Sequence, residues 1–150
     1  MSHLILLDSG PLGMVTNPKA KGITLDCQMW LKSILQRGGK VAIPEIADYE
    51  VRRELIRAGL QKSLGRLNNL KQTLEYIPIQ TDTMLLAANL WAEERQTGKP
   101  TADHKALDGD VILCAQAILL SNRDTKVIVA TTNVAHLSRF ITALDWQSIE

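Results

Sequence analysis

The sequence predicts a doubly wound α/β fold, with a mainly parallel central sheet of four to five strands between two layers of helices. Short runs of branched aliphatic residues, typical of strands buried on both faces, alternate with longer segments of helical periodicity. Such alternation connects parallel strands by right-handed crossovers and gives three-layer α/β/α folds. With 150 residues, the chain fits one domain covering residues 1–150.

The expected elements follow in order along the chain. Strands are expected at residues 4–7, 41–43, 76–79 and 127–130, and residues 146–149 are a candidate short edge strand. Pro78 places the third run at a sheet edge, because proline cannot donate to a central ladder. Helices are expected at 26–37, 45–58, 60–74, 83–97 and 108–121. Gly38-Gly39, Gly59 and Gly98 end the first, second and fourth of these helices.

Composition and charge exclude several classes of protein. A content of 45% hydrophobic and 22% charged residues is ordinary for a globular chain and excludes disorder. The net charge of +1 excludes a globally basic nucleic-acid coat, although a local basic face remains open. Cys27 and Cys114 lie in separate helical segments, which is typical of small core residues in a reduced protein. The apolar run 4–7 is too short for a signal sequence or a membrane span, so we expect a cytoplasmic protein without a membrane partner.

Acidic residues lie near the carboxyl ends of the expected strands, where doubly wound folds bind ligands. Asp8 directly follows the first strand. Its structural alternative is an aspartate that opens the turn Ser9-Gly10-Pro11 and accepts hydrogen bonds from backbone N–H groups about two residues on. Helical projection of residues 45–58 places Glu50 and Glu54 among the apolar side chains, where a carboxylate needs a cation or hydrogen-bond donors. The alternative for both is an intrahelical pair with an arginine or lysine.

The last long helix contains two further carboxylates. From Val111 to Leu120 only Gln116 is polar, which predicts a helix buried nearly all round. We assign Asp108 mainly to the N-cap of this helix, and Asp110, in its first turn, mainly to function.

Asp8, Glu50 and Asp110 come from different elements that the doubly wound arrangement brings to one sheet edge. Carboxylate sets select Mg²⁺ or Mn²⁺ rather than zinc, and most often act on phosphate groups. The sequence contains no Cys-x-x-Cys pair, metal-spaced histidines, Gly-x-Ser-x-Gly elbow or phosphate-binding glycine loop.

Residues 52–71 form a basic stretch next to these carboxylates. Six basic residues against Glu54 give a local charge of +5, and the remaining chain has a charge of −4. Such a stretch suits the docking of a phosphodiester backbone, and the alternative is an ordinary solvated helix face. The candidate docking residues are Arg52, Arg53, Arg57, Lys62 and Arg66.

Four segments together resemble a known family over nearly the whole chain. They are Leu6-Leu7-Asp8-Ser9, Pro44-Glu45 through Glu50-Val51-Arg52-Arg53-Glu54, Asp108-Gly109-Asp110-Val111-Ile112-Leu113, and Ala130-Thr131-Thr132-Asn133-Val134. In this order and spacing they resemble a PIN domain of the VapC type. The resemblance implies a Rossmann-like sheet and a Mg²⁺- or Mn²⁺-dependent endoribonuclease that cleaves RNA and is often a homodimer. In many members a small antitoxin from the same operon inhibits the enzyme, so the resemblance implies a toxin with a cognate antitoxin.

Carried over residue by residue, the resemblance implies metal-binding roles for Asp8, Glu50 and Asp110, and a polar site role for Thr131. The chain departs from the family at the fourth acid, which members place as an aspartate at the position of Asn133 or as Asp or Glu at the position of His136. Asn133 can still orient a water or ligate through its carbonyl, and His136 could bind Mn²⁺ or a phosphate. Neither adds negative charge, so a second metal would be held less firmly.

Asp103 or Asp108 could compensate for the fourth acid that the chain lacks. The same departure motivates an alternative function, a catalytically degenerate PIN domain that binds RNA or a protein without cutting. Another aspartate-centred α/β fold, such as a phosphotransfer receiver or a haloacid-dehalogenase-like phosphatase, needs an acidic pair or an Asp-x-Asp motif. The segment Leu7-Asp8-Ser9-Gly10 supplies neither.

Overall fold

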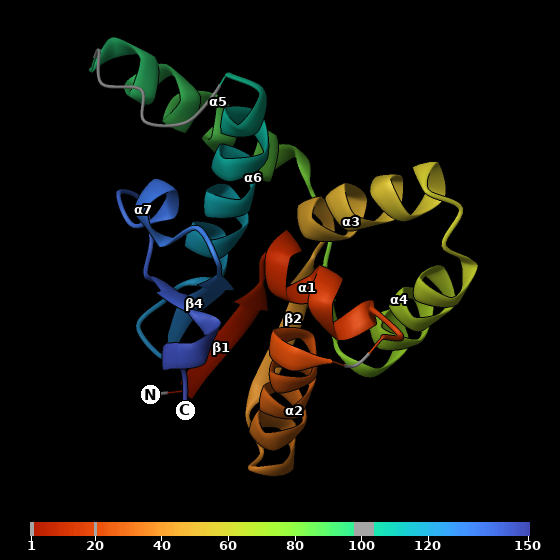
Figure 1. The fold of residues 1–150 in the computed structure, drawn as a ribbon. Coiled ribbons are helices and arrows are strands. Elements are labelled where there is room, and N and C mark those ends of the chain that lie inside the picture. The colour runs from red at the N-terminus through yellow and green to blue at the C-terminus, as the bar shows by residue number, and fades with distance from the viewer. Residues whose placement is uncertain (1, 20, 98–103) are drawn as a thin grey trace.

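A five-stranded sheet with parallel pairing throughout forms the centre of the molecule, in the order β3-β2-β1-β4-β5 (Figure 1). The computed structural model describes residues 2–19, 21–97 and 104–150. The strands are β1 (Ser2–Leu7), β2 (Lys40–Pro44), β3 (Glu75–Ile77), β4 (Thr125–Thr131) and β5 (Ala143–Asp145). The expected parallel α/β sheet is confirmed, and β3, which directly precedes Pro78, lies at an edge as its proline predicted.

Helices connect the strands and cover both faces of the sheet. They are α1 (Ser9–Thr16), α2 (Gly22–Gln36), α3 (Glu45–Arg57), α4 (Gln61–Thr73), α5 (Thr81–Gln96), α6 (His104–Leu120) and α7 (Val134–Leu137), with a 3₁₀ helix at Trp146–Ser148. Gly38 and Gly59 follow α2 and α3 with φ of 81° and 70°, a left-handed backbone that glycine adopts without strain. Gly98 lies outside the described residues.

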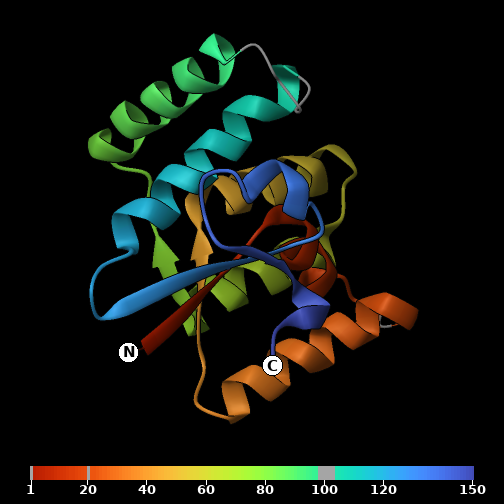
Figure 2. The same cartoon turned by 90° about the vertical axis from the view of Figure 1, so that its left-hand side faces the viewer.

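Two hydrophobic cores lie on opposite faces of the sheet. Helices cover both faces (Figure 2), which confirms the three-layer arrangement. Successive strand residues point to opposite faces, so Leu4 and Leu6 of β1 pack in one core while Ile5 and Leu7 pack in the other. The first core contains residues of α5 and α6, and the second contains residues of α1, α2 and α4. Both cysteines are free and buried, one in each core, as their sequence context predicted.

Two predicted elements near the chain ends are corrected by the structure. Asp8 is followed by the helix α1 rather than by a simple turn, because Pro11 falls in the first helical turn, where its missing N–H costs nothing. The last strand is β5 at Ala143–Asp145 instead of 146–149. The side chain of Asp145 accepts from the backbone N–H of Gln147, and this cap starts the 3₁₀ helix that contains Trp146.

Helix α6 begins earlier than its sequence pattern indicated. It starts at His104, so Asp108 lies inside the helix and is not its N-cap, and Asp110 lies beyond the first turn. The prediction failed because apolar residues become continuous only from Val111, whereas hydrogen bonding propagates a helix through polar residues as well.

Gln116 is the buried polar residue of α6, as the sequence predicted. Its side-chain amide donates to the carbonyl of Ile77 at 2.8 Å, and its oxygen accepts from the N–H of Ile46 at 3.4 Å. It thereby satisfies backbone groups at the end of β3 and at the start of α3. Over the part of the chain that the structure describes, none of the helices has the length and apolar character needed to cross a bilayer.

Candidate metal-binding active site

The candidate site lies where the strand order reverses. From β1 the chain continues outward on one side through β2 and β3, and β4 then pairs with the other side of β1. Ligands of doubly wound sheets bind at such a switch point, beyond the carboxyl ends of the strands. Asp8 follows β1 and Thr131 ends β4, so both residues lie at this position.

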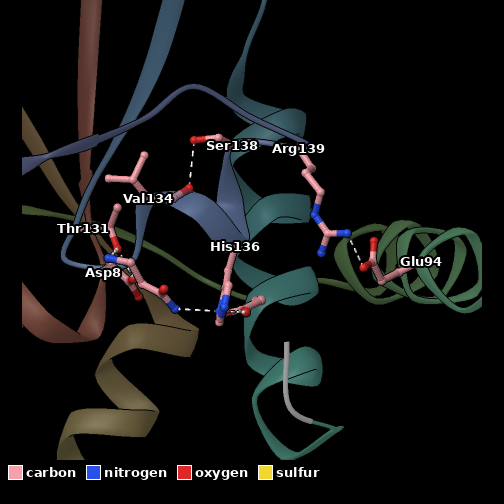
Figure 3. Close-up of polar contacts among 9 residues, drawn as sticks. Asp8, Glu94, Thr131, Val134, His136, Ser138 and Arg139 are labelled. Carbon is pink, nitrogen blue, oxygen red and sulfur yellow. Dashed lines mark hydrogen bonds and ion pairs between the residues drawn. The ribbon is translucent and has the colours of Figure 1, made fainter. Parts of the chain in front are cut away.

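Asp8 is held in place by hydrogen bonds on both carboxylate oxygens. Oδ1 accepts from the N–H of Ser9 at 2.7 Å and thereby caps α1. Oδ2 accepts from the hydroxyl of the fully buried Thr131 at 2.7 Å (Figure 3). The same hydroxyl oxygen accepts from the N–H of Asn133 at 2.8 Å. Thr131 therefore fixes both the orientation of the Asp8 carboxylate and the turn after β4.

The carboxylate of Glu50 reaches from α3 to the backbone of α6 at Gly109. A Cβ atom on Gly109 would lie 2.7 Å from Oε2 of Glu50, closer than such atoms approach in real proteins. Glycine at this position thus makes room for the carboxylate. Burial raises the pKa of Glu50, the negative charges of Asp8 and Asp110 raise it further, and Arg53 partly opposes them.

Asp110 is the third carboxylate of the site. Burial is the main cause that raises its pKa to about 6, the charge of Asp8 adds to this, and His136 and Arg139 act in the opposite direction. Its Oδ2 atom is buried and has no hydrogen-bond partner among the described residues. A buried carboxylate oxygen without a donor is costly, which points to a cation as its missing partner.

Helix α7 places a histidine beside this oxygen. Nδ1 of His136 lies 3.8 Å from Oδ2 of Asp110 and 2.9 Å from the side-chain nitrogen of Asn133. The histidine side chain is 29% exposed, so the Asp110 side of the site is open to solvent. Asn133 itself is exposed and starts α7 without a side-chain cap.

The predicted set of Asp8, Glu50 and Asp110 is thus electrostatically coupled in one region at the switch point. Among the side chains that the structure describes, those of residues 2–19, 21–97 and 107–150, no three Asp, Glu, His or Cys groups surround a single point closely enough to ligate one ion. The unpaired oxygen of Asp110, the space at Gly109 and the three carboxylates have the chemistry that a hard divalent cation requires.

Asp108 is exposed and lies on another face of α6, because two residues correspond to a rotation of about 200°. There it lines a groove of about 380 Å³ between α5 and α6, together with Trp91 and Val111. Asp103, the other residue considered as a compensating acid, lies outside the described residues.

The predicted docking residues of the basic stretch differ in their surroundings. Arg53 is exposed and stacks over the ring of Tyr49 at 4.9 Å. Arg57 pairs with Glu54 at 2.9 Å on the surface, the intrahelical pair considered as the alternative for Glu54. Lys62 and Arg66 are exposed on α4.

Arg52 differs from the other docking candidates, because part of its guanidinium group forms an internal ion pair. Its Nε donates to Asp48 at 3.0 Å, and its side chain is 28% exposed.

Sequence reasoning did not single out two buried carboxylates that form ion pairs. Asp48 on α3 is 4% exposed and contacts Arg52, Lys71 at 3.2 Å and the hydroxyl of Tyr76 at 3.2 Å. The spacing of Asp48 and Arg52, four residues apart on a helix, was the available signal. The charge of Asp48, after burial, raises the pKa of Tyr76.

The other carboxylate is Glu94 of α5, which is 4% exposed. It forms an ion pair with Arg139, just after α7 (Figure 3). This pair joins residues far apart in the chain, and no periodicity of the sequence could have indicated it.

Comparison with known proteins agrees with this geometry at the level of the fold. No protein-family model and no curated protein matches the chain. Among solved structures, it is similar to VapBC2 from Rickettsia felis bound to a DNA fragment from their promoter, with 16% identity and a TM-score of 0.69 over 95% of this chain and 98% of that chain. It is also similar to VapBC-1 from nontypeable Haemophilus influenzae, with 15% identity and a TM-score of 0.63 over 97% of this chain and 99% of that chain.

A third similar structure is DNA-bound VapBC from Salmonella typhimurium, with 16% identity and a TM-score of 0.66 over 97% of this chain and 99% of that chain. At such identities the likeness establishes the fold, and it covers nearly the full length of each chain. The five-stranded parallel sheet, the helices on both of its faces and these likenesses agree: the protein has the fold of a VapC-type PIN domain.

Proposed function

We propose that this protein is a Mg²⁺- or Mn²⁺-dependent endoribonuclease, the VapC-like toxin of a toxin–antitoxin pair. The observation that carries the proposal is the meeting of Asp8, Glu50 and Asp110 at the switch point of the sheet. The three carboxylates are coupled strongly enough that burial and mutual repulsion raise the pKa of both Glu50 and Asp110. A site that concentrates negative charge in this way gains most from a divalent cation.

In this proposal Asp8, Glu50 and Asp110 hold the cation. Bound there, a divalent ion would lower the pKa of water for attack on phosphorus and neutralise charge on the scissile phosphate. The hydroxyl of Thr131 orients Asp8 through its 2.7 Å hydrogen bond. Asn133, exposed at the start of α7, is placed to orient a water or a substrate oxygen from the rim.

The substrate backbone is proposed to dock on α3 and α4. Arg53, Arg57, Lys62 and Arg66 are exposed along these helices, and Arg53 lies close enough to Glu50 to lower its pKa. Cations beside the acidic site attract the phosphates, so binding should weaken as salt increases. Arg52 contributes less directly, because its Nε is engaged by Asp48.

The proposed partners are an antitoxin and a second copy of this chain. The similar solved structures are VapBC complexes, which supports an antitoxin partner for a chain of the same fold. The homodimer follows from the family resemblance, and light scattering of the purified chain tests it directly.

The test of the proposed function is cleavage of total RNA and of tRNA with Mg²⁺ or Mn²⁺ and with EDTA. Asp8→Asn removes one anionic ligand while keeping the side-chain shape, and Asp26→Asn, exposed on α2, is the matched control. We expect cleavage only with metal, a loss of at least about 100-fold in Asp8→Asn, and an unchanged rate in Asp26→Asn. Cleavage in EDTA, or full activity of Asp8→Asn, would show that the proposal is wrong.

A second candidate function is a PIN domain that binds RNA without cutting it. The neutral Asn133 and the imidazole of His136 on the rim favour it, because they add no charge to hold a second ion. Two results together would support this candidate over the nuclease. The chain would bind RNA without cleaving it, and Asp110→Ala would bind Mn²⁺ as the native chain does.

A further inference from the structure

We infer that His136 is a nitrogen ligand of the cation site and that it makes the site favour Mn²⁺ over Mg²⁺. The inference rests on the proposed function, since it concerns the cation held by Asp8, Glu50 and Asp110. His136 would add a nitrogen ligand to a set of three carboxylates. The site would then discriminate between Mn²⁺ and Mg²⁺, which the carboxylates alone do not do.

The first support is the position of the imidazole. Nδ1 of His136 faces Oδ2 of Asp110 at 3.8 Å, which is too long for a hydrogen bond. Bonds of about 2.0–2.3 Å to one ion place two neighbouring ligand atoms about 3–4 Å apart. The facing oxygen is buried and finds no hydrogen-bond partner in the described part of the chain. A cation between the two atoms would satisfy both.

The second support is the state of the ring nitrogen. The side-chain nitrogen of Asn133 lies 2.9 Å from Nδ1 of His136, and an amide NH₂ group can only donate. In this orientation of the amide, Nδ1 accepts the hydrogen bond and therefore carries no proton. A ring nitrogen that binds a metal must also be unprotonated. Nδ1 of His136 could therefore release its hydrogen bond from Asn133 and bind the ion without a change of tautomer.

The third support is the rigid attachment of α7. Leu137, next to the histidine, is fully buried, and Ser138 donates from both its N–H and its hydroxyl to the carbonyl of Val134. Arg139 then pairs with the buried Glu94 of α5 (Figure 3). His136 is thus presented to Asp110 from a fixed backbone, and its 29% exposure leaves a path for a hydrated ion.

Ligand chemistry gives the direction of the selectivity. Mg²⁺ prefers oxygen ligands in near-ideal octahedral geometry and gives up its water reluctantly. Imidazole nitrogen suits transition metals, and Mn²⁺ is a transition metal that also takes the carboxylate ligands of Mg²⁺. Replacing an oxygen donor by His136 therefore weakens Mg²⁺ more than Mn²⁺.

The experiment measures metal binding by the full-length chain without any substrate. Mn²⁺ binding is followed by the loss of the electron paramagnetic resonance signal of the free ion, with Mg²⁺ as competitor, and electron spin echo modulation detects a coordinated ¹⁴N. The variants are His136→Gln, which removes the ligand, and His136→Asp, which replaces nitrogen by oxygen. His3→Gln, at the exposed start of β1, is the matched control.

We expect ¹⁴N coupling in the native chain and in His3→Gln, and none in His136→Gln. The ratio of Mn²⁺ to Mg²⁺ affinity should fall by about tenfold in His136→Gln, and further in His136→Asp because a new carboxylate favours Mg²⁺. If Mn²⁺ binds without ¹⁴N coupling, or if His136→Gln leaves the ratio unchanged, the inference is overturned while the proposed cation site stands. If neither ion binds the native chain, the proposed function is overturned together with it.

Discussion

Asp110 shows how a buried carboxylate of the candidate site lowers the stability of the protein that contains it. Burial and the neighbouring Asp8 raise its pKa to about 6, from 3.8 for an unperturbed group. The folded state therefore binds the proton more tightly than the unfolded chain does. As pH rises from about 4 to about 6, the folded state retains a proton that the unfolded chain has lost, and the free energy of unfolding decreases.

Replacing this carboxylate by an amide should stabilise the protein at neutral pH. For Asp110→Asn we expect a higher free energy of unfolding at about pH 7, and a weaker decrease between about pH 4 and about pH 7, in urea titrations. Asp108→Asn, exposed on the same helix, is the matched control and should leave both quantities unchanged. If Asp110→Asn has the same pH dependence as the native chain, the carboxylate is not the group that titrates.

Asp48 is a buried carboxylate with a structural role. Its two oxygens contact Arg52, Lys71 and Tyr76, so α3, α4 and β3 meet at one negative charge. Asp48→Asn should lower the free energy of unfolding by about 3 kcal/mol, because two partly buried cations, Arg52 and Lys71, lose the charge of a buried carboxylate. Glu54→Gln on the same helix breaks an exposed pair with Arg57 and should cost at most about 1 kcal/mol. Equal costs for the two variants in urea unfolding would contradict the structural role of Asp48.

At the scale of elements, the short helix α7 depends on a contact with a distant helix. A four-residue helix is unstable by itself, and the ion pair of Arg139 with Glu94 attaches its end to α5. This attachment determines where Asn133 and His136 lie relative to Asp110.

Glu94→Gln tests the attachment of α7. We expect the free energy of unfolding to fall by about 2–3 kcal/mol, because a buried ion pair loses one charge. Hydrogen exchange at the amides of Ser138 and Ile141, which donate to Val134 and Leu137, should become faster. Glu93→Gln, exposed at the neighbouring position, should change neither measurement. Unchanged exchange in Glu94→Gln would show that the buried contacts of Leu137 suffice to hold α7.

Strands and helices with a strong hydrophobic pattern were predictable from the sequence. Elements whose position depends on caps and on contacts with distant segments were not. The strands at 4–7, 41–43 and 127–130 have continuous aliphatic runs, and the structure places a strand at each. By contrast, α1 depends on the cap that Asp8 supplies and on the close approach of Gly10 to Thr132, where a Cβ would lie 2.8 Å from the hydroxyl. Such contacts form between segments far apart in sequence, so local patterns do not report them.

At the scale of the whole molecule, the candidate site depends on how closely α3 and α6 approach. Gly109→Ala should favour helix α6 by up to about 1 kcal/mol while it displaces the carboxylate of Glu50, which lies where the new Cβ would be. We therefore expect unchanged or higher stability in urea unfolding, together with weaker Mn²⁺ binding. The fold should stay intact, because the new Cβ displaces a flexible carboxylate and no backbone atoms.

Gly65→Ala on α4 is the matched control for this prediction. A Cβ there would have no atom within 4 Å, so the substitution should add a similar helical stabilisation and leave Mn²⁺ binding unchanged. If Gly109→Ala binds Mn²⁺ as well as Gly65→Ala does, the contact between Glu50 and α6 is not needed for the site.

The sequence by itself determined the layers and the parallel sheet, because these follow from hydrophobic periodicity. It also predicted that Asp8, Glu50 and Asp110 lie in one region, and the structure couples their charges there. Only the tertiary structure decided the roles of individual polar groups: Asp108 lies outside the acidic cluster, Asp48 and Glu94 are buried ion-pair partners, and His136 faces Asp110. The physical reason is distance. Periodicity is a local property of the chain, whereas the charge, burial and hydrogen bonding of a side chain depend on atoms that only folding brings near it.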